Sequence, residues 1–479
     1  MPPVSSPGSQ TARVTVVERA ARVRFRRALA LMLMTLVLPG SAQLVAGNRR
    51  VGIIALRIWV LLVASTLVSM VVGVVWHGVF LWMAFDTAAL LWLRLLLTAL
   101  AIGWALLFFD AWRLGQPLTL SISHRRAAIG VHGVLCFSIA ACLLFGAHLA
   151  GVQRSFILAM SGDGEATGAH DGRYNVLLLG GDAGAGRWGL RPDSMTVASI
   201  DEETGRTVLI SLPRNMQNFP FAKGSVMAEQ FPDGFDADYL NGVSTWAMDN
   251  TELFPKSEHP GVDATVMAVE GITGLKINYW VMVNLEGFKD LVDAVGGVTL
   301  NVRQPIPVGL PSDSFYTHIQ PGVQKLDGFE TLWFSRARYD SDDYSRMARQ
   351  KCVMSAMLRQ VSPQTALTNF ADIAHASSDM VSTSIPASEF GDFVQLALKA
   401  RNQKVSTLSL VPPMINTAHP DVPLIRSKDA KAIARAEGDA PAGSGKGRRA
   451  ADGTVTGGSL GSLSTGYAAN EADDLDSAC

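Results

Sequence analysis

The sequence predicts a layered α-β-α domain with a mixed central sheet, preceded by a helical transmembrane region. Two observations carry this prediction. Apolar residues are concentrated in residues 28–152, where three stretches each reach the roughly 20 residues that a bilayer crossing needs. Beyond residue 174, short apolar strands alternate with helical patterns, which is typical of layered α/β domains. The formal net charge of -1 argues against a nucleic-acid-binding protein, which usually carries a strongly basic domain.

Residues 1–27 form a basic arm, which we expect to be cytoplasmic. The transmembrane region 28–152 then contains three or four helical segments. We expect crossings at residues 51–76, 87–109 and 127–151. A weaker candidate at residues 28–47 is interrupted by Pro39-Gly40, because proline and glycine break a helix.

The basic residues predict the orientation, because Lys and Arg stay on the cytoplasmic side. They gather before residue 28, at residues 49–50 and at residues 113–126. If 28–47 is a re-entrant or interfacial hairpin, all these clusters face the cytoplasm and the chain after residue 151 lies outside the cell. If 28–47 crosses fully, the large domain lies inside. We prefer the first arrangement; a cleavable signal sequence ending near residue 42 is a further alternative.

We expect residues 153–173 to form a linker and residues 174–425 to form the catalytic domain, with its core motifs in 174–362. The expected strands are 174–179, 194–200, 207–212, 279–285 and 298–302, and the expected helices are 263–272, 286–295 and 343–360. From residue 426 to 479 the chain is rich in Gly, Ser and Ala, which predicts a disordered tail. Pairing of Cys352 with Cys479 stays open, because two distant cysteines pair only where geometry allows it.

A glycine-rich loop follows the first expected strand. Gly184, Gly186 and Gly189 match the spacing of a dinucleotide-binding loop, but no helix opens there and Pro192 follows shortly. We therefore reject a nucleotide motif. A flexible loop that carries carboxylates can hold a divalent cation and still approach a phosphate closely.

The densest polar cluster lies near the last expected helix. It comprises Arg336, Arg338, Asp343, Arg346 and Gln350. If residues 335–339 are extended, Arg336 and Arg338 point to one side, and two guanidinium groups there suit a pyrophosphate. Residues 343, 346 and 350 share one helix face, which continues into apolar residues such as Met354 and Met357. A polar head group above an apolar tunnel fits both halves of this face.

Several arginines in different segments would repel one another at a shared site. Arg191 and Arg214 belong to this set, because each adjoins an expected strand. A bound polyanion removes the repulsion. The residues by themselves thus predict a membrane-tethered site for an amphiphile with a diphosphate head, with a divalent metal.

The order of these motifs resembles the LytR-CpsA-Psr family. The matching segments are residues 175–182 (NVLLLGGD), 191–195 (RPDSM), 211–215 (SLPRN), 279–288 (YWVMVNLEGF), 292–298 (VDAVGGV), 336–338 (RAR) and 343–350 (DYSRMARQ). The multispan N-terminus and the loop near Phe219-Pro220-Phe221 are similar to actinobacterial members.

The resemblance implies a multi-pass protein of the cell membrane with an extracytoplasmic catalytic domain. Its activity would be a phosphotransferase that moves a glycopolymer phosphate from a polyprenyl-pyrophosphate carrier to peptidoglycan during cell-wall assembly. The cargo would be teichoic acid, capsule or arabinogalactan, and the acceptor the 6-hydroxyl of muramic acid. The lipid tail would lie in the hydrophobic core of the domain.

The resemblance also assigns roles to single residues. Asp182 and Asp193 match the acidic positions tied to Mg²⁺ (or Mn²⁺). The positions around the pyrophosphate are Arg191, Arg214, Arg336, Arg338, Arg346 and Gln350. The residues expected to act in catalysis are Asp193, Arg214, Arg338 and Asp343. Asp343 would either orient Arg346 or act as a base.

Two departures from the family pattern concern substrate contacts. Asn215 stands where many members have Asp, so we assign it no acid role. The segment 239–241 lacks a lysine that often precedes Asn241. Two alternative functions remain: a pyrophosphatase that uses water as acceptor, and a non-catalytic protein that binds or anchors wall polymers.

Overall fold

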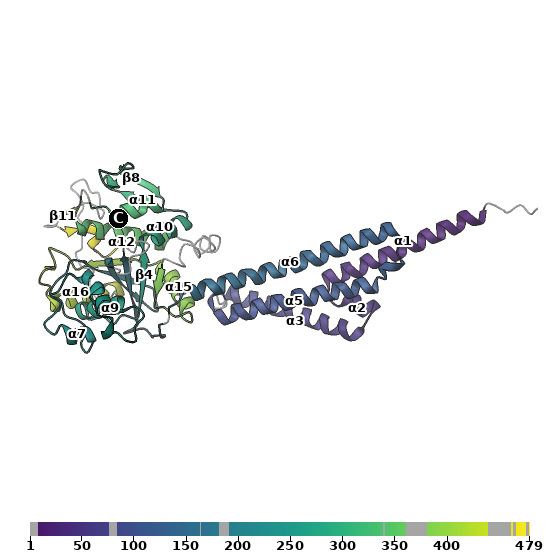
Figure 1. The fold of residues 1–479 in the computed structure, drawn as a ribbon, viewed down its shortest axis with the longest axis horizontal. Helices are drawn as coiled ribbons and strands as arrows, with labels where there is room; N and C mark the ends of the chain where they lie inside the picture. Colours follow the sequence, from purple (N-terminus) through teal and green to yellow (C-terminus); the bar gives the residue numbers. More distant parts are fainter. Residues whose placement is uncertain are drawn as a thin grey trace, which may run out of the picture. The chain divides into compact units, whose positions relative to one another are not determined.

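A computed structural model gives the fold and describes residues 8–75, 84–162, 164–181, 191–338, 341–360, 381–438, 461–462, 466–475 and 479. The chain forms two compact units, Met1–Ser155 and Phe156–Cys479, which we describe in turn (Figure 1).

The N-terminal unit is helical. Its helices are α1 (Gly8–Val37), α2 (Ser41–Ala46), α3 (Arg49–Val75), α5 (Thr87–Leu114) and α6 (Ile122–Met160). Three of the described helices are long and apolar enough to cross a membrane, at Arg49–Val72, Thr87–Thr119 and Ile122–Leu158. They correspond to the three expected crossings. Helix α6 extends beyond the expected crossing, because Phe156, Ile157 and Leu158 continue its apolar sequence, so the linker begins later than residue 153.

The predicted break between α1 and α2 is present. Gly40 has a φ of +92°, and a side chain there would lie 2.6 Å from the carbonyl oxygen of Gly52 on α3. Only glycine combines this backbone conformation with such close packing. Residues 28–47 therefore comprise the end of α1, a tight turn and the short helix α2.

The second unit is the α/β domain. Its main sheet contains β1 (Arg173–Gly181), β2 (Pro192–Asp201), β3 (Thr207–Leu212), β4 (Tyr279–Asn284), β9 (Val381–Thr383), β10 (Val405–Ser409) and β13 (Glu471–Ala472). The smaller strands are β5 (Val298–Val302), β6 (Ile306–Val308), β7 (Thr317–Ile319), β8 (Gly322–Leu326), β11 (Gly461–Ser462) and β12 (Gly466–Tyr467). The α-helices are α7 (Val226–Gln230), α8 (Val243–Asp249), α9 (Pro260–Thr273), α10 (Leu285–Ala294), α11 (Gly328–Arg336), α12 (Asp343–Gln360), α15 (Phe390–Ala400) and α16 (Val422–Glu437).

The main sheet is mixed, as expected. Its strand order among the described residues is β13-β10-β3-β2-β1-β4-β9. Strand β1 pairs antiparallel with β2 and parallel with β4, and β10 pairs parallel with β3. The expected hairpin joins β2 and β3, and Gly205 in its turn has a φ of +75°. The five predicted strands and three predicted helices are confirmed, with shifts of a few residues at their ends.

Helices cover both faces of the sheet, which gives the predicted α-β-α layers (Figure 1). Alternate residues of a strand point to opposite faces. Leu177 and Leu179 accordingly lie in a core that includes Val269 of α9 and Ile425 of α16. Leu178, between them, packs toward α12 on the other face. Strands β5 to β8 and α11 form a third core, which closes one side of the space beneath α12.

The prediction of a disordered tail from residue 426 is wrong for the described part of that segment. Helix α16 continues to Glu437, and Gly438 caps it with a φ of +88°. Strand β13 joins the edge of the main sheet, and Leu475 is fully buried. Cys479 forms a disulfide with Cys352 of α12, with the two Cα atoms 5.6 Å apart. The Gly-, Ser- and Ala-rich composition does not reveal this ordered structure, because the anchoring contacts are made with residues far away in the sequence.

One buried carboxyl predicts how stability depends on pH. Asp429 of α16 is 1% exposed, and neither carboxylate oxygen has a hydrogen-bond partner among the described residues. Burial raises the pKa of Asp429 to about 8. A carboxyl with a raised pKa in the folded state makes folding progressively less favourable as the pH rises from the ordinary carboxyl range toward that raised value.

Asp429→Asn is therefore expected to stabilise the protein more at pH 8 than at pH 5. The gain at pH 8 is expected to exceed the gain at pH 5 by a few kcal/mol, because each unit of a raised pKa is worth about 1.4 kcal/mol and the amide of asparagine does not ionise. Thermal unfolding of the solubilised chain at both pH values measures the difference. An equal change in Tm at the two pH values would contradict the assignment.

Candidate active site

A cavity of about 830 Å³ lies beneath α12 and joins a polar mouth to an apolar interior. Its polar lining includes Asp193, Arg338, Arg346 and Gln350. The apolar lining comes from the sheet and from helices α10 and α12: Leu178, Val281, Val283, Phe288, Leu291, Met354 and Met357. The predicted helix face, with charges at its start and apolar residues beyond, lines this cavity.

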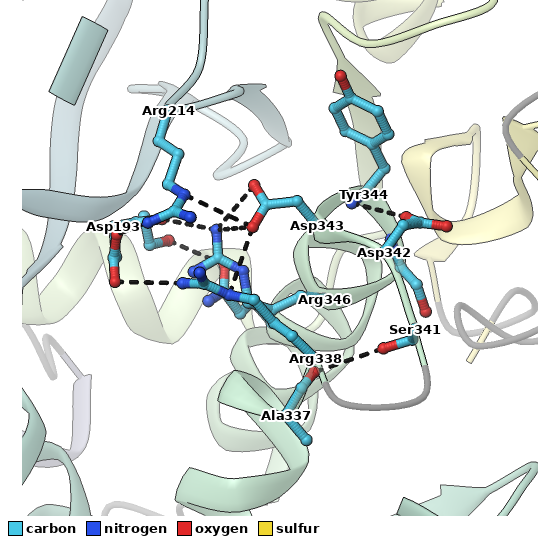
Figure 2. Close-up of polar contacts among 12 residues, drawn as sticks. Asp193, Arg214, Ala337, Arg338, Ser341, Asp342, Asp343, Tyr344 and Arg346 are labelled. Carbon is cyan, nitrogen blue, oxygen red and sulfur yellow. Dashed lines mark hydrogen bonds and ion pairs between the residues drawn. The ribbon is translucent and has the colours of Figure 1, made fainter. Parts of the chain in front are cut away.

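Asp193 is a meeting point of three arginines (Figure 2). Its Oδ1 accepts a hydrogen bond from Nη1 of Arg214 at 2.5 Å, and its Oδ2 accepts one from Nη2 of Arg338 at 3.2 Å. Its backbone oxygen accepts a third from Nη2 of Arg346 at 2.8 Å. Asp193 is the second residue of β2, Arg214 follows β3, and Arg338 follows α11, so the ends of three elements meet here.

Asp343 holds the same three arginines from the other side (Figure 2). Its Oδ1 lies 3.1 Å from Nη2 of Arg346, 3.4 Å from Nε of Arg338 and 3.6 Å from Nε of Arg214. It is the first residue of α12, and Arg346 is one turn further along the same helix. These contacts indicate that Asp343 orients the arginines rather than acting as a base.

The electrostatics of the cluster keep Asp193 ionised. Burial alone raises the pKa of Asp193, but the hydrogen bond from Arg214 and the charges of Arg346 and Arg338 outweigh it, so the pKa lies below its ordinary value. With two carboxylates and three guanidinium groups, the cluster keeps one excess positive charge. The two carboxylates therefore partly relieve the mutual repulsion of the arginines that the sequence predicts. The positive charge that remains favours the binding of an anion.

Arg346 has the most constrained guanidinium of the cluster. Its side chain is 2% exposed, whereas those of Arg214 and Arg338 are 29% and 37% exposed. Among the described residues, its Nε has no hydrogen-bond acceptor. Buried donors are normally satisfied, so an orphaned one at the lining of a cavity favours a ligand with acceptor oxygens.

Gln350 and Arg191 lie at the edges of the cluster. The amide oxygen of Gln350 accepts from Ser194 at 3.0 Å, and its nitrogen donates to the Ser335 carbonyl at 3.2 Å. Arg191 instead donates to Asp238 at 2.7 Å and to Asn241 at 3.3 Å. Its side chain is half exposed, and its link to the cluster runs through Asn241, whose backbone nitrogen donates to the Arg214 carbonyl at 3.1 Å.

The position expected for Arg336 is wrong. Residues 328–336 form helix α11, which opens with a capping box between Asp327 and Glu330, so Arg336 and Arg338 do not alternate along an extended strand. The Arg336 guanidinium lies over the ring of Trp333, 5.1 Å from its centroid. Arg336 lines the cavity, yet its ring contact places it apart from the Asp193–Asp343 cluster.

The predicted metal ligand Asp182 lies outside the described residues, with most of the glycine-rich loop. Within the described part of the chain, no group of three or more His, Cys, Asp or Glu residues could hold a metal ion. The donors at the mouth still fit a magnesium ion held jointly with a substrate, because Mg²⁺ is commonly bound by one or two carboxylates plus substrate phosphates. Asp193 supplies such a carboxylate at the cavity lining.

Sequence reasoning missed the residues that hold α12 in place. Lys351 of α12 is fully buried, and its ammonium group donates to the side chains of Ser409 and Asn470, the latter at 2.8 Å. Asn470 in turn donates to the backbone oxygen of Tyr344, next to Asp343, at 3.1 Å. Burial lowers the pKa of Lys351 to about 7. No local signal marks Lys351, because polar Arg349 and Gln350 directly precede it, and its partner Asn470 lies in the segment expected to be disordered.

Parts of this chain are similar in sequence to known proteins. Biofilm regulatory protein A of Streptococcus mutans is 27% identical over 263 residues, which cover 53% of this chain and 60% of that protein. A protein of Bacillus cereus named polyisoprenyl-teichoic acid–peptidoglycan teichoic acid transferase TagU is 29% identical over 220 residues, which cover 46% of this chain and 62% of that protein. The chain thus matches about 60% of the length of these relatives.

The similarity to solved structures is weaker than the sequence similarity to these relatives. The crystal structure of Bacillus subtilis TagV superposes with a TM-score of 0.41 at 22% identity, and the match covers 57% of this chain and all of that one. The family model of the LytR_cpsA_psr family matches residues 152–419, which is more than half of the chain and contains the whole Asp193–Asp343 cluster. This protein belongs to the LytR_cpsA_psr family.

Proposed function

We propose that the protein transfers a glycopolymer phosphate from a polyprenyl-pyrophosphate carrier to peptidoglycan. One observation carries the proposal: Arg338 and Arg346 line a cavity whose interior is apolar. Asp193 and Asp343 hold these two arginines together with Arg214. A diphosphate head complements the excess positive charge of the cluster. An isoprenoid tail complements the interior. The name of the Bacillus cereus relative, a teichoic acid transferase acting on peptidoglycan, supports the same class of activity.

Each residue of the cluster has a task in the proposed reaction. An acceptor hydroxyl oxygen attacks the phosphorus next to the glycan, the bond from that phosphorus to the bridging oxygen breaks, and polyprenyl phosphate leaves with the electron pair. The hydroxyl proton passes to water at the open mouth. Arg214, Arg338 and Arg346 stabilise the charge on the leaving phosphate, because phosphoryl transfer depends mainly on positioning and on charge neutralisation. Asp193 and Asp343 hold these arginines in position.

A divalent metal belongs to this proposal as a bound cofactor. Mg²⁺ (or Mn²⁺) would be held by Asp193 together with the substrate phosphates, and Asp182 is the second ligand predicted from the sequence. When bound, the ion would neutralise the developing charge on the phosphate oxygens.

We also propose that the domain lies on the outer side of a membrane in which the apolar helices are embedded. The basic clusters near α1, α3 and α6 favour this orientation by the positive-inside rule. The disulfide between Cys352 and Cys479 supports it independently, because disulfides persist in oxidising compartments outside the cytoplasm.

Product analysis tests the reaction. Purified full chain would be incubated with a synthetic polyprenyl-pyrophosphoryl sugar, peptidoglycan fragments and Mg²⁺, and the products identified by mass spectrometry. The proposal expects a sugar phosphate joined to the glycan and free polyprenyl phosphate. Free sugar phosphate without the joined product would favour the pyrophosphatase alternative. Tight binding without turnover would favour the anchoring alternative.

The cavity predicts a dependence on lipid length. Val283→Trp places an indole in the apolar interior, so the transfer rate at subsaturating carrier is expected to fall at least tenfold for a long polyprenyl carrier. A carrier with a short lipid should be much less affected, because its tail ends before the obstruction. Val283→Leu is the matched control. An equal loss for both carriers would place the tail outside this cavity.

A further inference from the structure

Exposed apolar side chains of the domain gather around residues that line the cavity. Leu310, Phe315 and Phe329 are 53%, 51% and 42% exposed. Together with Trp333 they form what we call the aromatic rim. Large exposed apolar groups close together on a soluble surface mark an interaction site, whereas isolated ones need no explanation.

The rings of the rim pack as one unit. Phe315 and Phe329 have centroids 6.0 Å apart, and each lies within 6.4 Å of the ring of Trp333. Phe315 also lies against Gly309, where an added side chain would come within 2.9 Å of the ring. This packing holds the rings in place before binding, so little side-chain conformational entropy is lost when a partner covers them.

The rim continues into the cavity. Gly309, Leu310 and Trp333 line the cavity, and the exposed rings of Phe315 and Phe329 contact Trp333. A partner covering the rim would therefore directly contact Leu310 and Trp333, which line the cavity. The exposed Arg336 guanidinium lies over Trp333 at the same place, so a cation borders the apolar surface.

This combination matches the surface of a lipid bilayer. Aromatic rings partition to the headgroup region of a membrane, where one side is apolar and the other is wet. An adjacent arginine can bind lipid phosphate. A second copy of the chain fits less well, because a stable interface buries roughly 800 Å² on each partner, far more than these four side chains expose.

The length of the connecting segment limits how far the domain can lie from a membrane that holds α6. The membrane-capable stretch Ile122–Leu158 lies in α6, and β1 of the domain begins at Arg173. Residues 161–172 separate the end of α6 from β1, and a segment of that length spans at most about 40 Å.

We propose that the aromatic rim is a bilayer-docking surface, which inserts into the headgroup region of the membrane that anchors the chain. Docking at this place would open the cavity toward the lipid phase, so that a carrier tail could enter it without crossing water. The docking itself is independent of the reaction, whereas its use for loading a lipid tail rests on the proposed function.

The depth of a spin label tests the docking. Full chain with Phe315→Cys, in a background of Cys136→Ser and Cys142→Ser that keeps the Cys352–Cys479 disulfide, would be labelled and placed in nanodiscs of zwitterionic and anionic phospholipid. Leu424→Cys on α16, also an exposed apolar position, is the matched control. Relaxation by oxygen and by a water-soluble nickel complex measures the depth of each label.

The proposal expects the label at residue 315 to be accessible to oxygen and shielded from nickel, and the label at residue 424 to be accessible to nickel. Equal accessibility to nickel at both positions would overturn it. Dipolar broadening between labels at residue 315, without shielding from nickel by lipid, would assign the rim to self-association and would also overturn it.

A functional test separates docking from the reaction. In nanodiscs, Phe315→Ser with Phe329→Ser should lower transfer from a long-chain carrier at least tenfold, with unchanged turnover of a short water-soluble carrier. Equal loss for both carriers would overturn the loading role. Docking by the label without transfer by the wild-type chain would leave the docking proposal standing and refute the proposed function.

Discussion

Arg338→Ala is expected to lower the rate of glycopolymer transfer by about 100-fold to 1000-fold while the domain stays folded. The loss follows from removing one preorganised donor to developing charge, which is worth roughly 3 kcal/mol of barrier in comparable sites. Folding should survive, because the side chain is 37% exposed and Asp193 keeps its contacts with Arg214 and Arg346. Single-turnover transfer with saturating carrier measures the effect.

Two further variants show whether charge or geometry is responsible. Arg338→Lys should recover only part of the rate, because an ammonium group cannot reproduce the planar fork of a guanidinium. Arg435→Ala, which removes an arginine 3.8 Å from Asp473 and away from the cavity, should transfer at the wild-type rate. Wild-type transfer by Arg338→Ala, at equal Tm, would remove Arg338 from the site.

Cys479→Ser is expected to destabilise the domain by about 4–5 kcal/mol and to loosen α12. The disulfide closes a loop between residues 127 apart, and the chain-entropy model assigns about this much to a loop of that size. Without it, the pairing of β13 with β10, the contacts of Asn470 and the burial of Leu475 must hold the segment 466–475. Because α12 carries Asp343 and Arg346, transfer should fall at temperatures well below the new Tm.

A reductant provides the control for this variant. Thermal unfolding of the wild type in dithiothreitol should reproduce the loss seen in Cys479→Ser, and the reductant should have no further effect on the variant. Cys142→Ser, which removes a free cysteine, should leave the domain transition unchanged. An unchanged wild-type Tm under full reduction, checked by thiol labelling, would show that the pairing contributes nothing to stability.

Local patterns were sufficient to predict the elements that build the site. The strand at residues 207–212 was predicted with the bounds of β3, and the helix at residues 343–360 with the bounds of α12. The spacing of Arg346 and Gln350 correctly predicted that both line a cavity, and Asp343 at the start of the same helix contacts Arg346. These predictions hold because helix and strand periodicity follow from the chain itself.

The failures concern contacts between distant segments. The extended conformation considered for residues 335–339 is not present, because α11, which opens with a capping box at Asp327, continues to Arg336. The short run around Arg338 has no periodicity of its own that could indicate this. The C-terminal segment has a composition typical of disorder, yet β13 pairs with β10 and Asn470 satisfies the buried Lys351. Pairing of this kind depends on the assembled sheet, so composition cannot indicate it.

A photoreactive carrier tests most directly whether lipid and diphosphate share the one cavity. Full chain would be irradiated with a polyprenyl diphosphate that carries a diazirine near the end of its tail, and the crosslinked residues mapped by mass spectrometry. Binding of the lipid tail and the diphosphate in the same cavity predicts crosslinks to the apolar lining, at Val281, Leu291 or Met357, which Arg338→Ala weakens. Crosslinks confined to other parts of the domain, or an unchanged yield in Arg338→Ala, would contradict it.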